Sequence, residues 1–113
     1  MLADFSLQSS LLGLTAADLA RKFEVQERTA RRWLTGRAMP PAPVIEQVQE
    51  SFESFLESLG SMIELLDDNE EIYAHILDPE QAEYKHMRPL VQAIYLLCSL
   101  YQIETEITFK QEK

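Results

Sequence analysis

Side chains that can hydrogen bond to nucleotides are concentrated in one short segment near the N-terminus, residues 26–37. A guanidinium donates two parallel hydrogen bonds to O6 and N7 of guanine, an amide pairs with adenine, and a carboxylate accepts from the cytosine amino group. Each good pair is worth about 1 to 3 kcal/mol of discrimination. The candidate residues are Gln26, Glu27, Arg28, Arg31, Arg32, Thr35 and Arg37. Their chemistry fits recognition of base edges and phosphates.

A single helix would bring these side chains to one face. We predict that it begins at Gln26 or Glu27, because Ala30 and Trp33 recur at helical spacing and would pack inward, leaving the arginines outside. Gly36 is a natural stop for this helix.

The arginines fall into two predicted roles. Arg28 and Arg31 are best placed to read bases, whereas Arg32 and Arg37 lie further around or beyond the helix, where a flexible cation more often meets phosphate. The alternative is that the arginines form only a solvated helix face.

A second short helix is predicted just upstream, over residues 16–23. Thr15 can cap it, and Asp18 three residues later completes a weaker form of the capping box. Leu19 and Phe23 give this helix an apolar face, and Val25 follows as the inward residue of a tight turn.

The two helices and their turn resemble the helix-turn-helix of Cro-like and lambda-repressor-like regulators, over roughly residues 3–60. The matching inward positions are Ala20, Val25, Ala30 and Trp33. Two positions depart from the family pattern. Glu24 stands where the family commonly has a glycine with positive φ, which costs a non-glycine residue about a kcal/mol. Ala16 stands where many members have a phosphate-contacting glutamine, so that contact is not expected.

The resemblance implies that the helix at 26–35 enters the major groove of double-stranded DNA. It also implies a homodimer, because such proteins usually bind two half-sites about 34 Å apart. The expected function is therefore a dimeric transcriptional repressor of phage or mobile-element type that binds an inverted-repeat operator.

The charge of the chain is segregated. The formal net charge is −9, yet residues 1–41 hold six basic and four acidic side chains, a net of +2. The remaining 72 residues hold four basic and 15 acidic side chains, a net of −11. We expect the acidic part to point away from DNA while the basic tip binds it.

Two regions are predicted, a DNA-binding domain over residues 1–50 and an acidic dimerisation region over 51–113, with one helix continuous across the boundary. Phe5, Leu7, Leu11 and Leu12 predict a first helix over the helix-turn-helix core, closed by Gly13. A long helix should begin at about Val44. Its apolar residues recur in steps of three and four: Ile45, Val48, Phe52, Phe55, Leu59, Met62 and Leu66.

The C-terminal half predicts a helix between two short extended segments. Residues 72–77 are ambiguous between helix and strand, with strand favoured, and a buried helix is predicted from about Arg88. Residues 103–109 alternate like a half-buried strand, which would pair with residues 72–77 or with its own copy across a dimer axis. The fold class is therefore mainly α with a short β-strand pair. The predicted dimer interface comprises Phe55, Leu59, Met62, Leu66, Ile107 and Phe109.

Catalysis is not expected. The three glycines are isolated, so no glycine-rich loop can cradle a phosphate. The pairs Glu71/His75 and Glu83/His86 have helical spacing, but solvated histidines are favoured over a metal site, and neither a metal nor another cofactor is predicted. Cys98 is expected to be buried.

No apolar run reaches the length of a membrane span, and no secretory signal is evident, so a soluble cytoplasmic protein is predicted. The competing function is an antitoxin-like or other protein-interaction module whose acidic C-terminal half binds a partner protein. A disordered tail would favour that alternative, whereas a folded C-terminal half favours the regulator.

Overall fold

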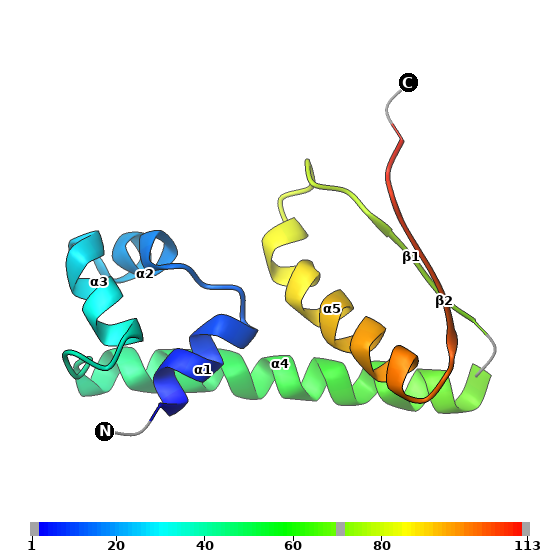
Figure 1. The fold of residues 1–113 in the computed structure, drawn as a ribbon, viewed down its shortest axis with the longest axis horizontal. Helices are drawn as coiled ribbons and strands as arrows, with labels where there is room; N and C mark the ends of the chain where they lie inside the picture. Colours follow the sequence, from blue (N-terminus) through cyan, green and yellow to red (C-terminus); the bar gives the residue numbers. More distant parts are fainter. Residues whose placement is uncertain (1–2, 70–71, 112–113) are drawn as a thin grey trace. The chain divides into compact units, whose positions relative to one another are not determined.

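The chain folds into helices with one small sheet, as the ribbon in Figure 1 shows. The computed structural model describes the backbone of residues 3–69 and 72–111 and, within them, every side chain except those of residues 66–69 and 72. The elements in chain order are α1 (Asp4–Leu11), α2 (Ala16–Phe23), α3 (Glu27–Leu34), α4 (Ala42–Asn69), β1 (Ile72–Leu77), α5 (Tyr84–Leu100) and β2 (Glu104–Phe109). The predicted fold class, mainly α with a short strand pair, is confirmed.

The chain divides into two compact units, Met1–Phe55 and Leu56–Lys113, and the division falls inside α4. The N-terminal unit contains α1, α2, α3 and the first half of α4. The C-terminal unit contains the second half of α4 followed by β1, α5 and β2.

The short helix α2 has the predicted capping box. The Thr15 hydroxyl accepts from the Asp18 amide at 3.1 Å, and the Asp18 carboxylate accepts from the Thr15 amide at 2.9 Å. The helix ends at Glu24, whose φ of 54° is left-handed, and α3 then begins at Glu27 with Gln26 as its N-cap. These boundaries are those that the sequence predicts.

One apolar core holds the N-terminal unit together. Its buried members are Phe5, Leu19, Ala30, Trp33, Val44 and Val48, and Val25 and Ile45 pack against them. The prediction for the first helix is wrong at two positions, because Leu7 and Leu11 are 60% and 55% exposed. Phe5 and Ser9, four residues apart, point inward instead. Leu7 and Leu11 are each two positions away from one of these residues, which places them roughly 200° around the helix, on the exposed side.

The long helix α4 begins at Ala42, two residues before the predicted start, with Pro43 in its first turn. A proline is tolerated there because the first amides of a helix have no partner within it.

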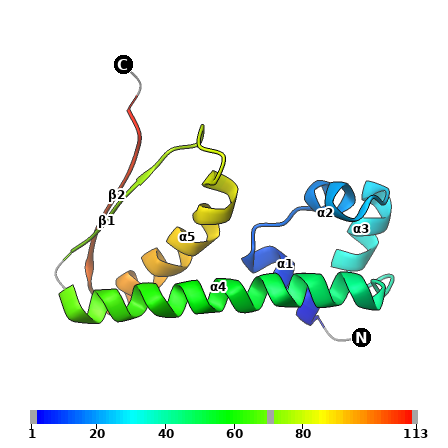
Figure 2. The same cartoon turned by 180° about the vertical axis from the view of Figure 1, so that it is seen from behind.

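In the C-terminal unit, β1 and β2 pair in parallel and are joined by α5 (Figure 2). The register sets Ile72 opposite Glu104 and Leu77 opposite Phe109. The prediction that residues 72–77 form a strand and pair with the last strand is confirmed. Since β2 has a partner within its own chain, it does not need to pair with β2 of a second copy.

Helix α5 begins at Tyr84, one turn before the predicted Arg88. The Arg88 guanidinium donates to Tyr84 in the preceding turn and to Gln92 in the following one, and it lies over the Tyr84 ring, so it stabilises this extra turn although Pro89 follows. The helix ends at Leu100 with Tyr101 as its C-cap, and Gln102, the next residue, has a φ of 60°.

Most buried residues of α5 lie on one face, and Pro89, on the other side of the helix, is buried as well. Leu90, Val91, Ile94 and Cys98 are buried, and α5 contacts both strands. The predicted helix, apolar on more than one face and expected in a core or an interface, is only partly buried within the single chain, where Leu96 is 68% exposed and Tyr101 is 70% exposed. Burial raises the pKa of the Cys98 thiol. Burial, together with the nearby Cys98, raises the pKa of Tyr73.

Candidate nucleic-acid interface

The structure places every predicted DNA-contacting residue on the surface of α3 and its flanks. The exposed set comprises Gln26, Glu27, Arg28, Arg31, Arg32, Thr35 and Arg37. The opposite side of the helix is fixed in the core, where Ala30 is fully buried and Trp33 is 5% exposed. A single helix thus presents the whole candidate set from a rigid base.

Trp33 anchors this helix through two aromatic contacts. The Phe5 ring meets it edge-on at 6.3 Å between centroids, and the Phe23 ring meets it at 6.4 Å. Edge-to-face pairs of this kind contribute about 0.5 to 1.5 kcal/mol beyond their buried area. Because Phe5 lies on α1 and Phe23 on α2, the Trp33 indole packs α1, α2 and α3 against one another.

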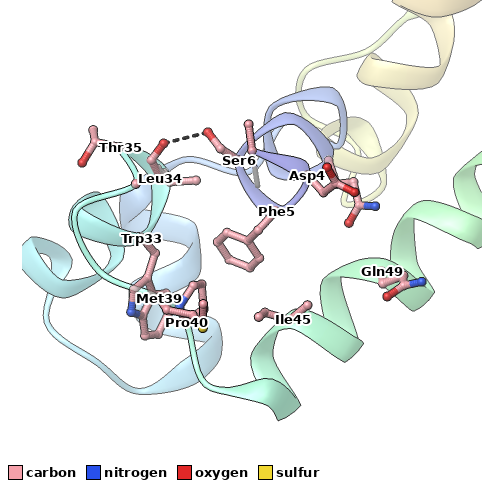
Figure 3. Close-up of a pocket in the computed structure, with 13 residues that line it drawn as sticks. Asp4, Phe5, Ser6, Trp33, Leu34, Thr35, Met39, Pro40, Ile45 and Gln49 are labelled. Carbon is pink, nitrogen blue, oxygen red and sulfur yellow. Dashed lines mark hydrogen bonds between the residues drawn. The ribbon is translucent and has the colours of Figure 1, made fainter. Parts of the chain in front are cut away.

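The end of α3 is fixed by α1. The Ser6 hydroxyl donates to the backbone carbonyl of Leu34 at 2.7 Å, which satisfies one of the carbonyls left open at a helix C-terminus. Figure 3 shows this bond beside an open groove lined largely by apolar groups, among them Phe5, Trp33 and Ile45. The groove has a volume of about 740 Å³ and lies between α1, the end of α3 and the start of α4.

The turn between α2 and α3 contains a left-handed residue at the position where a positive φ is predicted. Glu24 adopts the left-handed conformation, and the Val25 amide donates to the Ala20 carbonyl at 3.0 Å. Val25 is half-buried against the core. The direction in which α3 leaves this turn is therefore set by one residue in an uncommon conformation.

The charged side chains of α3 differ in their freedom. Arg31 Nη2 lies 2.9 Å from Glu27 Oε1, but both side chains are more than half exposed, so this pair is weak, about 0.3 to 0.5 kcal/mol. Among the described residues, Arg28, Arg32 and Arg37 have neither an ion pair nor a hydrogen-bonded side-chain partner. These three guanidinium groups can bind an anion without breaking an internal contact.

Gln26 is also available for binding. It is the N-cap of α3, yet its side chain makes no capping hydrogen bond. Its amide can therefore pair with a base or a phosphate while the helix start remains unchanged.

The predicted dimer-interface residues come from two elements, α4 and β2. Phe55 belongs to the N-terminal unit and stacks on Phe52 at 6.2 Å between ring centroids. Leu59, Met62 and Ile107 are half-buried in the C-terminal unit, and Phe109 is 57% exposed. The Leu66 side chain lies outside the described residues.

Sequence reasoning found α5 apolar on more than one face but did not show that Leu96 and Leu100 stay exposed in the single chain. The signal was present, because Ala93, Leu96, Leu97 and Leu100 recur at i, i+3, i+4 and i+7, the spacing of a second helix face. The sequence alone could not show which of the two faces the sheet covers.

The structure offers little support for metal binding. Among the described residues, no three His, Cys, Asp or Glu side chains lie close enough to hold an ion. Glu71 lies outside the described residues, and Glu83 and His86 are both exposed. Within the same part of the chain, no helix is both long and apolar enough to cross a membrane.

No protein-family model matches the chain, and no curated protein is similar to it.

Proposed function

We propose that this protein is a sequence-specific DNA-binding transcriptional regulator, a cytoplasmic homodimer that represses transcription by occupying an inverted-repeat operator. The observation that carries the proposal is the surface of α3. Among the described residues Arg28, Arg32 and Arg37 have no ion pair, and with Gln26 they project from α3 and its flanks, while Trp33 fixes the other side of the helix in the core.

The size of α3 fits the major groove, which admits one α-helix. Arg28 lies in the first turn of α3 and Arg31 follows about one turn later, so both can reach base edges from the N-terminal half of the helix. Arg32 and Arg37 can bind the flanking phosphates. An inverted repeat follows from the expected two-fold symmetry of the dimer.

The alternative of an antitoxin-like module receives less support. That reading favours a disordered acidic tail, whereas β1, α5 and β2 form a paired sheet with a helix across it.

The test is binding of the purified protein to the DNA upstream of its own gene, by fluorescence anisotropy with random-sequence competitor DNA and a salt titration. We expect selective binding that weakens steeply with salt, since each phosphate contact adds about 0.9 to the slope of log K against log salt. Binding to a random duplex with equal affinity would argue against a sequence-specific regulator.

Matched arginine variants locate the reading face. Arg28→Ala should reduce operator affinity by roughly 5- to 150-fold, which corresponds to the 1 to 3 kcal/mol of one base pairing. Arg21→Ala is the control, because Arg21 is exposed on α2 and already paired with Asp18 at 2.6 Å. Equal affinities for Arg28→Ala and the parent protein would show that this residue does not read bases.

A further inference from the structure

Helix α5 carries a second apolar face, which among the described residues is exposed at Leu96 and Leu100 and half-buried at Ala93 and Leu97. Leu96 is 68% exposed and Leu100 is 69% exposed, one turn apart on the same helix. Clustered exposure of large apolar side chains indicates a binding surface, unlike single scattered ones.

The sheet beside α5 also has an unprotected edge. Among the described residues the sheet consists of β1 and β2 alone, and a two-stranded sheet is only marginally stable in water. Free edges are usually blocked by charged residues or proline. β2 carries exposed Glu104 and Glu106, whereas β1 contains no Asp, Glu, Lys, Arg or Pro.

In a right-handed crossover, the open helix face and the open strand edge lie on one side of the unit. Nearly all crossovers between parallel strands are right-handed, and the second apolar face is rotated by roughly 120° from the buried face of α5. In a right-handed crossover this rotation turns Leu96, Leu97 and Leu100 toward the β1 side of the sheet and away from β2.

The charge distribution identifies the occupant. The chain has a net charge of −9, so two copies repel each other over most of their acidic surface. Residues 84–103 and β1 contain no Asp or Glu. This surface is therefore one on which two copies of the chain can approach without facing each other's carboxylates, and its charged side chains, Lys85 and Arg88, are in the first turns of α5.

We propose that a second copy of this chain binds here, with β1 of each subunit pairing antiparallel to β1 of the other about a two-fold axis. The result is a four-stranded sheet in the order β2, β1, β1, β2, with both α5 helices on the same side and their Leu96 and Leu100 faces in contact. Such an interface is isologous, because the same patch serves both subunits. The proposal rests on the dimer part of the proposed function and is independent of DNA binding.

The first experiment measures mass in solution by sedimentation. The parent protein should sediment as a dimer, with twice the chain mass of 13.0 kDa. The double variant Leu96→Glu/Leu100→Glu should sediment as a monomer, with the mass of one chain. The control is Leu7→Glu, the same change at a residue 60% exposed on α1, which should remain dimeric. A monomeric parent, or a dimeric double variant, would overturn the proposal.

The second experiment uses the unmodified protein, so it does not depend on whether a variant folds. A strand with neighbours on both sides hydrogen bonds every amide, whereas an edge strand leaves alternate amides open to exchange. Hydrogen exchange followed by NMR should show protection at every amide from Tyr73 to Leu77 and alternating protection in β2. Full protection of β2 with alternation in β1, or alternation in both strands, would refute the β1 pairing.

The two experiments also separate this proposal from DNA binding. A dimer with the predicted exchange pattern but no operator affinity would leave the interface standing and reject only the regulator function. Operator binding by a protein that is monomeric in sedimentation would reject the interface alone.

Discussion

Glu24 occupies a backbone conformation that glycine adopts more easily, so replacing it with glycine should stabilise the protein. Its φ of 54° and ψ of 46° lie in the left-handed region, and its side chain is exposed with no hydrogen-bonded partner among the described residues. The substitution therefore removes strain without removing a contact.

The size of the effect follows from two opposing terms. A non-glycine residue in the left-handed region costs about 1 to 2 kcal/mol. Glycine loses more conformational freedom on folding, which costs about 0.5 to 1 kcal/mol relative to alanine. Glu24→Gly should therefore raise the free energy of unfolding of the N-terminal unit by about 0.5 to 1 kcal/mol.

The assay is urea denaturation followed by tryptophan fluorescence. Trp33 is the one tryptophan of the chain and is buried in the core of the N-terminal unit, so its emission reports unfolding of that unit. The matched control is Gln47→Gly, at an exposed position inside α4, which should lower the free energy of unfolding by about 1 kcal/mol. If both glycine variants were destabilised equally, the left-handed turn, and with it the predicted direction of α3, would be refuted.

Three further outcomes are expected. Trp33→Ala should lower the free energy of unfolding of the N-terminal unit by about 3 to 5 kcal/mol through the cavity it leaves, measured by circular dichroism during urea denaturation; a loss below 1 kcal/mol would mean that the indole is not the anchor described. Thr15→Ala should lower the same free energy of unfolding by about 1 kcal/mol, because it removes the cap of α2. The control Thr35→Ala removes a hydroxyl that caps no helix start, so it should change the free energy of unfolding less in the same assay. The raised pKa of Cys98 means that the folded state holds the thiol proton more tightly than the unfolded chain. Stability should thus be unaffected by this group below its unfolded pKa of about 8.5 and fall as pH rises above it. Cys98→Ala should flatten that decline, and an unchanged pH profile in this variant would contradict the assignment.

The N-terminal unit could be predicted closely from the sequence because its signals are local. A capping threonine, a glycine stop after α3 and an apolar pattern with Trp33 inside are each sufficient to fix a boundary within a residue or two. The exposed set of α3 followed directly, since burial of Ala30 and Trp33 determines which side faces outward.

The C-terminal unit was less predictable because its structure depends on contacts between distant residues. The pattern of α5 is apolar on two faces, and only the position of the sheet decides that Ile94 is buried while Leu96 is not. Likewise, Leu7 and Leu11 looked like core residues on composition, but Phe5 and Ser9 occupy the side that meets α3. Hydrophobicity alone does not distinguish two faces of one short helix.

The parallel pairing of β1 with β2 has a consequence for the order of folding during synthesis. The helices α1, α2 and α3 contact neighbours close in sequence, so they can form soon after they leave the ribosome. Ile72 pairs with Glu104, and the sheet cannot close until all of α5 and β2 has been made. The nascent chain therefore carries a formed α3 while β1 still has two open edges, and completion of β2 is the step that leaves β1 with one open edge.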